Sequence, residues 1–225
     1  TQKWDIPKAK IWYKDKDTNK VRPIVSYFSF IGRRWMQKIG RAWTVLIKEM
    51  NKIWNTWEMQ SMEDLKKRVE SIKAKKLRKV DIVSMYTNIR KEDARKMMDE
   101  VLEVGKKKWK EGIWIAKHKE YKKKDTLRTR KGNKNYLNIK WEFLKLATDF
   151  ELDWTVFKVG DEYRKQKEGL PMGGLLSAQI ACMTLMWLEN MKYEEWKKMK
   201  RKFIRYRDDV LEITHMVIIW YFNWK

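Results

Sequence analysis

The sequence predicts an α+β fold, and three observations lead to that prediction. Short runs rich in Val, Ile, Tyr and Phe, each bounded by turn residues, are typical of β-strands. Apolar residues that recur at every third or fourth position indicate helices elsewhere in the chain. Of the 225 residues, 43% are hydrophobic and 37% are charged, a balance typical of a globular chain that can bury a core.

Strand-like runs occur in the first and last parts of the chain, next to turn-forming residues. Gly160 and Asp161, for example, separate two such runs, as in a β-hairpin. The run over residues 80–86 is expected to form a buried strand that begins on an acid, Asp81. We expect the other strands over residues 11–13, 21–30, 156–159 and 163–165, with a final hairpin over residues 203–213.

Helical spacing of apolar residues occurs in five stretches. We expect helices over residues 33–58, 62–75, 91–104, 140–152 and 176–191. Ser61, with an acid three residues later, matches a capping pattern for the second helix, and Asn88 is predicted to cap the third. Residues 105–135 are dense in lysine and predict an exposed loop or a hairpin insertion.

The net charge of +23 is the strongest signal in the composition. A charge of this size favours polyanions, and nucleic acid is the partner class that we expect. Ribosomal, chromatin and lipid-surface proteins share this property. The charge therefore indicates a class of partner and no activity.

Cysteine and histidine are scarce. The single cysteine, Cys182, excludes an intrachain disulfide, and with only His118 and His215 we expect no zinc site of Cys and His. We expect an intracellular protein without a membrane anchor, because the apolar run Met216–Phe222 is shorter than the about 20 residues that span a bilayer. The chain begins at Thr1 and stops in that apolar run, so we expect it to be part of a longer product.

Three acids predict a metal site. Asp208 and Asp209 lie at the tip of the final predicted hairpin, and two adjacent carboxylates repel each other unless water or a cation surrounds them. If the strand of Asp81 pairs with that hairpin, three carboxylates come together. Such a set fits two Mg²⁺ ions that assist an in-line phosphoryl transfer. The alternative for Asp208 and Asp209 alone is a solvated acidic turn.

Four stretches in this order resemble the catalytic core of a reverse transcriptase. They are Arg22–Ser26, Asp81–Ile89, Tyr163–Gly173 and Arg205–Asp209. The pattern is most similar to the Penelope-like branch, close to telomerase reverse transcriptases, and covers residues 8–214. The resemblance implies a right-hand polymerase fingers–palm core, with an antiparallel palm sheet packed on helices and no thumb.

The resemblance also divides the chain into four segments. Residues 1–79 correspond to a fingers-like segment, and residues 80–104 to the palm strand and helix that carry the first catalytic acid. Residues 105–160 correspond to a basic insertion and a connection between fingers and palm. Residues 161–225 correspond to a truncated palm part with the glycine loop, the long helix and the Asp-Asp hairpin.

The metal-binding and catalytic residues that the resemblance implies are Asp81, Asp208 and Asp209. The carbonyl of Ile82 is expected to add a backbone ligand. The implied cofactor is a pair of Mg²⁺ ions, for which Mn²⁺ can substitute. Asp209 corresponds to the third and less central acid of the family.

Further residues correspond to nucleotide and nucleic-acid contacts. Arg22 matches an arginine that clamps the triphosphate, with Lys10, Lys14 and Lys20 as candidates for a supporting role or as plain solvated lysines. Tyr86 matches an aromatic gate against the ribose 2′-hydroxyl, although an ordinary strand aromatic would look the same. The remaining implied contacts are Gly169, Pro171, Met172 and Gly173 with the nucleotide, and Gln166 and Tyr206 with nucleic acid.

The expected activity is RNA-dependent DNA synthesis on an RNA template, with a DNA primer and dNTPs, by a retroelement protein that would act in the nucleus of a eukaryote. The oligomeric state stays open. Two departures from the family pattern concern the site: Arg207 places a cation beside the acids, and Gly174 replaces a residue that is commonly serine. A viral-type RNA-dependent RNA polymerase and a degenerate nucleic-acid-binding relic are the alternatives.

Overall fold

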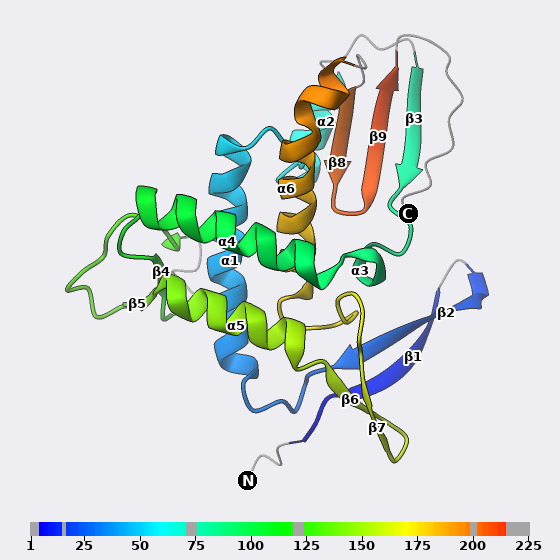
Figure 1. The fold of residues 1–225 in the computed structure, drawn as a ribbon, viewed down its shortest axis with the longest axis vertical. Coiled ribbons are helices and arrows are strands. Elements are labelled where there is room, and N and C mark those ends of the chain that lie inside the picture. The colour runs from blue at the N-terminus through cyan, green and yellow to red at the C-terminus, as the bar shows by residue number, and fades with distance from the viewer. Residues whose placement is uncertain (1–4, 15–16, 71–75, 119–123, 199–201, 215–225) are drawn as a thin grey trace. The chain divides into compact units, whose positions relative to one another are not determined.

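The computed structural model describes residues 5–14, 17–70, 76–118, 124–198 and 202–214. The chain divides into two compact units, the first formed by residues 1–50 and 84–185 and the second by residues 51–83 and 186–225. The mixture of helices and short sheets confirms the predicted α+β class (Figure 1). The division into four segments stays a prediction.

The larger sheet of the first unit consists of two hairpins. β1 (Lys8–Lys14) pairs antiparallel with β2 (Asp17–Ser26), and β6 (Val156–Val159) pairs antiparallel with β7 (Glu162–Lys165). β1 and β6 join them in parallel, which gives the order β2-β1-β6-β7. Both hairpins were predicted from the sequence. The second hairpin turns at Gly160, whose φ of 59° is a conformation that glycine adopts without strain.

A second sheet of the first unit has two strands, β4 (Ile113–Ala116) and β5 (Tyr136–Ile139). Its first strand lies in the lysine-dense stretch 105–135, where a loop or a hairpin was expected, and its second strand follows directly after residue 135. The side chains of Ile113, Ile115 and Ile139 are buried. The insertion therefore has an apolar side of its own, which a purely solvated loop would lack.

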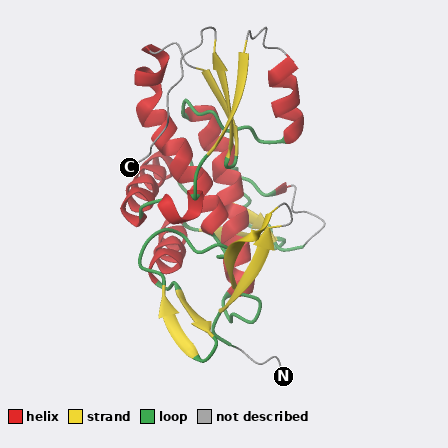
Figure 2. Ribbon diagram, turned by 90° about the vertical axis from the view of Figure 1, so that its right-hand side faces the viewer, coloured by secondary structure: helices red, strands yellow, loops and turns green. Residues whose placement is uncertain are grey.

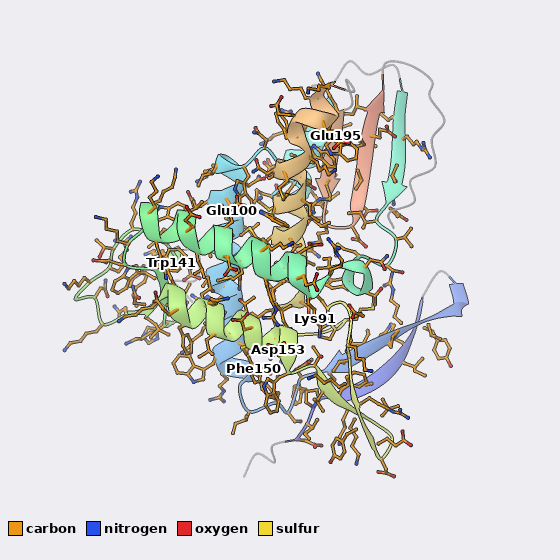
Figure 3. The ribbon with its side chains drawn as sticks, in the orientation of Figure 1. Lys91, Glu100, Trp141, Phe150, Asp153 and Glu195 are labelled. Atoms are coloured by element: carbon orange, nitrogen blue, oxygen red, sulfur yellow. The ribbon has the colours of Figure 1, made fainter. Side chains whose placement is uncertain are left out.

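The helices α4 (Lys91–Lys108) and α5 (Trp141–Asp153) of the first unit run antiparallel, with Lys91 and Asp153 at the same end of the pair (Figure 3). Gly105 allows close packing, because a Cβ atom there would lie 2.6 Å from the Trp141 ring. Arg95 of α4 reaches two acids of α5 at 2.8 and 2.7 Å. Apolar packing and ion pairs thus hold the two helices together.

The helix α1 (Arg33–Ile53) supplies much of the core of the first unit. Its apolar stripe includes Ile39, Trp43 and Leu46, all fully buried, as the helical spacing predicted. The indole N–H of Trp43 donates a hydrogen bond to Thr148 Oγ1 at 3.2 Å. The buried indole N–H group on this face therefore has a hydrogen-bond acceptor.

The second unit contains one three-stranded antiparallel sheet in the order β3-β9-β8 (Figures 1 and 2). Its strands are β3 (Lys76–Asp81), β8 (Lys202–Tyr206) and β9 (Asp209–Thr214). The helix α2 (Met62–Glu70) precedes β3 and begins after Ser61, whose hydroxyl accepts the N–H of Asp64 at 3.1 Å. The predicted cap and the predicted final hairpin are confirmed.

The strand predicted over residues 80–86 is wrong in its position and its burial. β3 ends at Asp81, and Tyr86 lies in the short helix α3 (Met85–Asn88). The pairing ladder stops at Asp81 because its partner strand β9 begins at Asp209, and the residues before Asp209 form the turn. Most of the described residues of β3 are exposed. Asp81 is therefore the last residue of its strand, whereas the prediction placed it at the start.

The ends of several helices also differ from the prediction. The residue before α4 is Arg90, not the predicted cap Asn88, and its guanidinium binds Asp93 at 2.8 and 2.9 Å. The helix predicted over 33–58 ends at Ile53, whereas α6 (Ser177–Lys198) continues well past residue 191. Residues 71–75 and the apolar run Met216–Phe222 lie outside the described residues. Within the described ranges, no helix combines the length and apolarity that a bilayer crossing requires.

Candidate active site

Two of the predicted metal-binding acids, Asp81 and Asp209, lie opposite each other at one end of the sheet in the second unit, and Asp208 lies in the adjoining turn. The ladder between β3 and β9 ends with Asp81 opposite Asp209. One residue further on, the N–H of Ile82 donates to the carbonyl oxygen of Asp208 at 3.0 Å. Strands that are distant in sequence are therefore neighbours, as a site formed by all three acids requires (Figure 1).

The turn between β8 and β9 consists of Arg207 and Asp208. Arg207 has a φ of 60°, which is unfavourable for a residue with a side chain. Its guanidinium carbon lies 5.4 Å from the centroid of the Tyr206 ring, within the range of a cation–π contact. The guanidinium of Arg207, which departs from the family pattern, thus lies over the ring of Tyr206.

Lys79 provides a cation next to two of the acids. Its Nζ atom lies 2.8 Å from Asp209 Oδ1 and 3.9 Å from Asp81 Oδ1. The hydrogen bond with Asp209, together with the charges of Asp209 and Asp81, raises the pKa of Lys79 above its ordinary value. The side chains of Asp81 and Asp209 are 73% and 59% exposed, so a dissolved cation has access to both.

The chemistry of these acids fits a hard divalent ion. They offer oxygen donors, they are accessible to solvent, and a single cation already lies near two of them. In the described part of the chain, no three His, Cys, Asp or Glu side chains are grouped closely enough to hold a metal by themselves. Mg²⁺ binds in such settings through one or two carboxylates, with water and substrate phosphates as further ligands.

The glycine loop lies in the first unit, where it contacts two other predicted motifs. The N–H of Leu170 donates to the carbonyl of Tyr86, and the N–H of Val25 donates to the carbonyl of Met172, each at 2.7 Å. The loop therefore joins α3 to β2. Three of the four stretches that resemble a reverse transcriptase meet in this way.

Two glycines of the loop are required by this close approach. Gly169 has a φ of 69°, and a Cβ atom there would lie 2.6 Å from Thr87 Cα. Gly173 has a φ of 91°, and a Cβ atom there would lie 2.5 Å from the carbonyl oxygen of Val25. Both positions need the backbone freedom and the small volume of glycine.

Three of the other predicted contact residues lie in the first unit, and one lies in the second. Tyr86 is half-buried on α3, and Arg22 is exposed on β2 opposite Trp12. The side-chain amide of Gln166 donates to the carbonyl of Glu168 at 2.8 Å, so it faces its own loop. The other predicted nucleic-acid contact, Tyr206, lies in the second unit and is half-buried.

Solved structures provide the comparison for this geometry. No known protein family matches the sequence, and no curated protein does. Telomerase from Candida albicans in complex with a fragment of telomeric RNA matches with a TM-score of 0.69 and 14% identity, over 96% of this chain and 39% of the telomerase. Apo telomerase from Candida tropicalis matches with a TM-score of 0.66 and 14% identity, over 93% and 38%.

This chain shares their fold. It spans less than half the length of either telomerase chain. At this level of identity the likeness concerns the arrangement of the backbone. The roles of individual residues stay predictions.

Glu151 is a residue of the first unit that sequence reasoning missed. It lies on α5, is 4% exposed, and accepts hydrogen bonds at 3.0 Å from the N–H of Leu176 and the hydroxyl of Ser177. Burial raises the pKa of its carboxyl group, while these hydrogen bonds act in the opposite direction. Glu151 thus supports the junction between the glycine loop and α6.

The position of Glu151 explains why residue 174 is glycine. A Cβ atom on Gly174 would lie 2.1 Å from Ser177 Oγ and 2.4 Å from Glu151 Oε1. The carboxylate occupies the space that the side chain of a serine would need. The departure at Gly174 was the one sequence signal for this arrangement, but it does not identify the partner.

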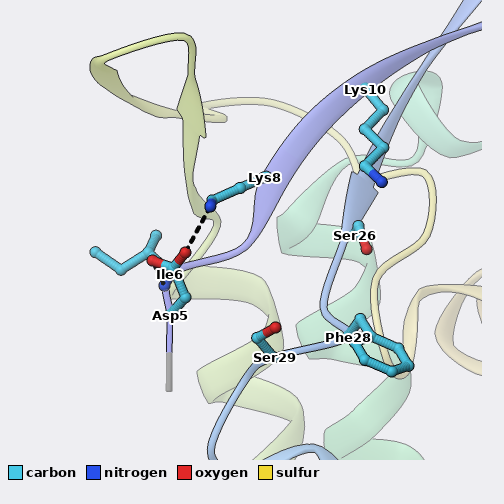
Figure 4. Close-up of a pocket in the computed structure, with 7 residues that line it drawn as sticks. All are labelled: Asp5, Ile6, Lys8, Lys10, Ser26, Phe28 and Ser29. Carbon is cyan, nitrogen blue, oxygen red and sulfur yellow. Dashed lines mark hydrogen bonds and ion pairs between the residues drawn. The ribbon is translucent and has the colours of Figure 1, made fainter. Parts of the chain in front are cut away.

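A pocket of about 310 Å³ opens beside β1 and β2 in the first unit (Figure 4). Its lining consists of Asp5, Ile6, Lys8, Lys10, Ser26, Phe28 and Ser29. Lys8 and Asp5 form an ion pair at 2.7 Å, which lowers the pKa of Asp5 and raises that of Lys8. Lys10, a candidate helper of Arg22, lies in this polar pocket and makes no ion pair with any residue that the structure describes.

Proposed function

We propose that this chain catalyses template-directed nucleotidyl transfer, namely RNA-dependent DNA synthesis by a two-metal mechanism. The observation that carries the proposal is the cross-strand pair Asp81 and Asp209, with Asp208 in the adjacent turn. This pair occurs in a chain that shares its fold with telomerases. The second unit is the core of a polymerase palm under this proposal, and the β1–β2 hairpin belongs to the fingers.

Asp81, Asp208 and Asp209 would hold two Mg²⁺ or Mn²⁺ ions, with the Ile82 carbonyl as a further ligand. Bound ions of this kind activate an attacking hydroxyl and stabilise the leaving oxygen of a phosphoryl transfer. Lys79 competes with a metal ion for Asp209, because its ammonium group lies 2.8 Å from one oxygen of that carboxylate.

The residues of the first unit bind the nucleotide under this proposal. The exposed guanidinium of Arg22 offers paired donors to triphosphate oxygens. The ring of Tyr86 excludes a ribose 2′-hydroxyl, while Gly169, Pro171, Met172 and Gly173 present backbone to the base pair. The hydrogen bond from the N–H of Leu170 to the backbone carbonyl of Tyr86 joins the loop to the main chain that carries the ring.

The proposed partners are an RNA template, a DNA primer and dNTPs. The Candida albicans telomerase was solved in complex with a fragment of telomeric RNA. The net charge of +23 supports binding of nucleic acid by this chain. We assign it to a Penelope-like retroelement protein that acts in the nucleus.

Lys79 favours a second function, nucleic-acid binding without catalysis. If its ammonium group stays next to Asp209 and near Asp81, it occupies part of the site and offsets one of the negative charges without a metal. The chain would then retain the fold and the charge for binding, and it would lose the chemistry. Primer extension distinguishes the two functions.

The decisive experiment is extension of a labelled DNA primer on an RNA template with dNTPs and Mg²⁺ or Mn²⁺, using this chain and a version that continues past Lys225. Asp208→Asn/Asp209→Asn should abolish product. The matched control is Asp161→Asn, a fully exposed acid in the β6–β7 turn of the first unit, which should leave product unchanged. An unaffected double variant would sink the two-metal assignment.

The choice of sugar provides a separate test against an RNA polymerase. Tyr86→Ala should raise incorporation of rNTPs relative to dNTPs, because removal of the ring opens space for the 2′-hydroxyl. Competition between the two nucleotide pools in the same extension reaction gives the ratio. An unchanged ratio would show that Tyr86 is not the gate.

A further inference from the structure

Arg205 is a buried arginine on β8, three residues before Asp208. Its side chain is 1% exposed, and a buried guanidinium is costly unless it is fully paired. Nη1 lies 2.5 Å from a carboxylate oxygen of Glu58, and Nε donates to a carboxylate oxygen of Glu189 on α6. Both glutamates are themselves buried, at 5% and 6% exposure. One cation thus links two acids inside the second unit.

The backbone of Arg205 is held as firmly as its side chain. Its N–H donates to the carbonyl of Trp57 at 2.8 Å, and its carbonyl accepts the N–H of Met59 at 2.7 Å. These two bonds form a parallel bridge between Glu58 and Arg205 along one edge of β8, and β9 pairs with the other edge. Arg205 is therefore fixed on both sides of its strand.

From this fixed position the guanidinium reaches the turn that carries the acids. Nη1 of Arg205 donates to the carbonyl oxygen of Arg207 at 2.9 Å. Arg207 has the positive φ that residues with side chains avoid, so its conformation needs support from its surroundings. The carbonyl of Arg207 belongs to the peptide that leads directly into Asp208. A hydrogen bond there restrains the direction in which that acid leaves the turn.

An aromatic cluster of half-buried residues lies on the same face of β8. The ring centroid of Trp57 lies 4.4 Å from that of Phe203 and 5.0 Å from that of Trp196. Phe203 and Arg205 lie on the same face of β8, because side chains alternate along a strand. The low polarity of the surroundings strengthens the charged hydrogen bonds of Arg205.

We propose that Arg205 is a positioning residue that sets the orientation of the Asp208–Asp209 turn for metal binding, and that Glu58 and Glu189 hold its guanidinium in place. The inference rests on the proposed function, because it concerns the same acids. Arginine suits the task, since its planar group carries donors in several fixed directions. The ammonium group of a lysine is a single point and cannot serve Glu58, Glu189 and the Arg207 carbonyl with the same geometry.

The test compares Arg205→Lys with Arg95→Lys. Arg95 also bridges two acids, Asp149 and Asp153, but it does so in the first unit and away from the acids of the turn in sequence. Two measurements are made on each variant. Hydrogen–deuterium exchange of a peptide over residues 203–211 reports on the turn, with a peptide over residues 39–47 of α1 as the internal reference for global unfolding. The Mg²⁺ concentration for half-maximal primer extension reports on metal binding, with KM for the primer–template as the reference.

For Arg205→Lys we expect exchange of the turn peptide to become at least tenfold faster relative to the α1 peptide. The half-maximal Mg²⁺ concentration should rise at least threefold, with KM for the primer–template changed less than twofold. Arg95→Lys should alter neither. Unchanged exchange in the turn would overturn the inference, and so would an unchanged Mg²⁺ requirement with active protein, because a merely structural arginine would lower stability without shifting metal binding.

The exchange measurement needs no enzymatic activity. A wild-type chain that fails to extend primers would contradict the proposed function, while exchange in the turn would still decide whether Arg205 holds it. If Arg205→Lys does not fold, Glu58→Gln keeps the shape of the side chain and removes one of the two charges that hold Arg205. Glu58→Gln is then expected to accelerate exchange of the turn peptide by a smaller factor, and no acceleration would count against the inference.

Discussion

The chain places carboxylates in two contrasting environments, one in each unit. Asp81 and Asp209 at the end of the β3–β9 ladder are 73% and 59% exposed, and both lie near the ammonium group of Lys79. Glu151 in the first unit is 4% exposed, and its hydrogen-bond donors, Leu176 N–H and Ser177 hydroxyl, carry no charge. The first pair can exchange its cation for another one from solvent. The buried Glu151 is not accessible to cations from solvent.

Under the proposed function, this contrast separates acids that bind a metal from an acid that stabilises the fold. Carboxylates that bind a metal must be accessible and must tolerate replacement of their partner, so stability gains little from them. A buried carboxylate is retained only where it satisfies other buried groups, and its removal leaves those groups unpaired. The exposed pair should therefore be sensitive in activity and the buried acid sensitive in stability.

The largest effect is expected for Asp81→Asn. Loss of a metal ligand removes several kcal/mol of transition-state stabilisation, so primer extension should fall about 10³-fold or more. Because Asp81 is exposed, the free energy of unfolding should change by only about 0.5 kcal/mol or less. Extension rates and urea denaturation on the same preparation check both halves. A large loss of stability would mean that the acid is part of the structural framework.

Glu151→Ala should show the reverse pattern. It leaves the N–H of Leu176 and the hydroxyl of Ser177 without their acceptor and opens a cavity, so we expect a loss of about 2–4 kcal/mol in unfolding free energy. Denaturation followed by tryptophan fluorescence measures the loss. A change within experimental error would show that the carboxylate is not needed at the start of α6.

The pH dependence of stability sharpens the same contrast. Burial raises the pKa of Glu151 in the folded state, so the folded chain binds a proton more tightly than the unfolded chain does. Its ionised form therefore costs stability, and that cost grows as pH rises from the ordinary glutamate pKa through the raised one. Below the ordinary pKa the cost is absent.

Glu151→Gln keeps an acceptor oxygen and cannot ionise. The unfolding free energy of Glu151→Gln minus that of the wild type should increase as pH rises from 4 to 8. Below the ordinary glutamate pKa this difference should stay constant. Denaturation series at several pH values provide the comparison. Parallel curves over the whole range would show that burial does not control the ionisation of Glu151.

The smallest effect is expected for Lys79→Met. Removal of the ammonium group leaves Asp81 and Asp209 without the competing cation, so the Mg²⁺ concentration for half-maximal activity should fall about two- to fivefold. A magnesium titration of primer extension measures it. Lys66→Met, which removes an exposed lysine that pairs with Glu70 on α2, is the matched control and should leave the magnesium requirement unchanged. A higher requirement in Lys79→Met would indicate that Lys79 assists the site.

The sequence alone determined the class of fold, the hairpins at both ends of the chain and most helices, because strand alternation, helical spacing and turn residues are local properties. It also indicated the acids and glycines of the candidate site. From the sequence, a site formed by the three acids required that the strand of Asp81 pair with the final hairpin. The structure met that condition but moved the end of the strand to Asp81, because the extent of a strand depends on where its partner begins.

Only the tertiary structure decided which polar residues support these motifs. Glu151, Glu58 and Glu189 look like ordinary surface acids in the sequence, and Arg205 looks like one more cation in a chain with 53 Lys and Arg residues. Their burial and pairing arise from packing between segments distant in sequence, which no local pattern encodes. A charged residue is stable in the interior only when its partner is brought to it, and that partner is chosen by the fold.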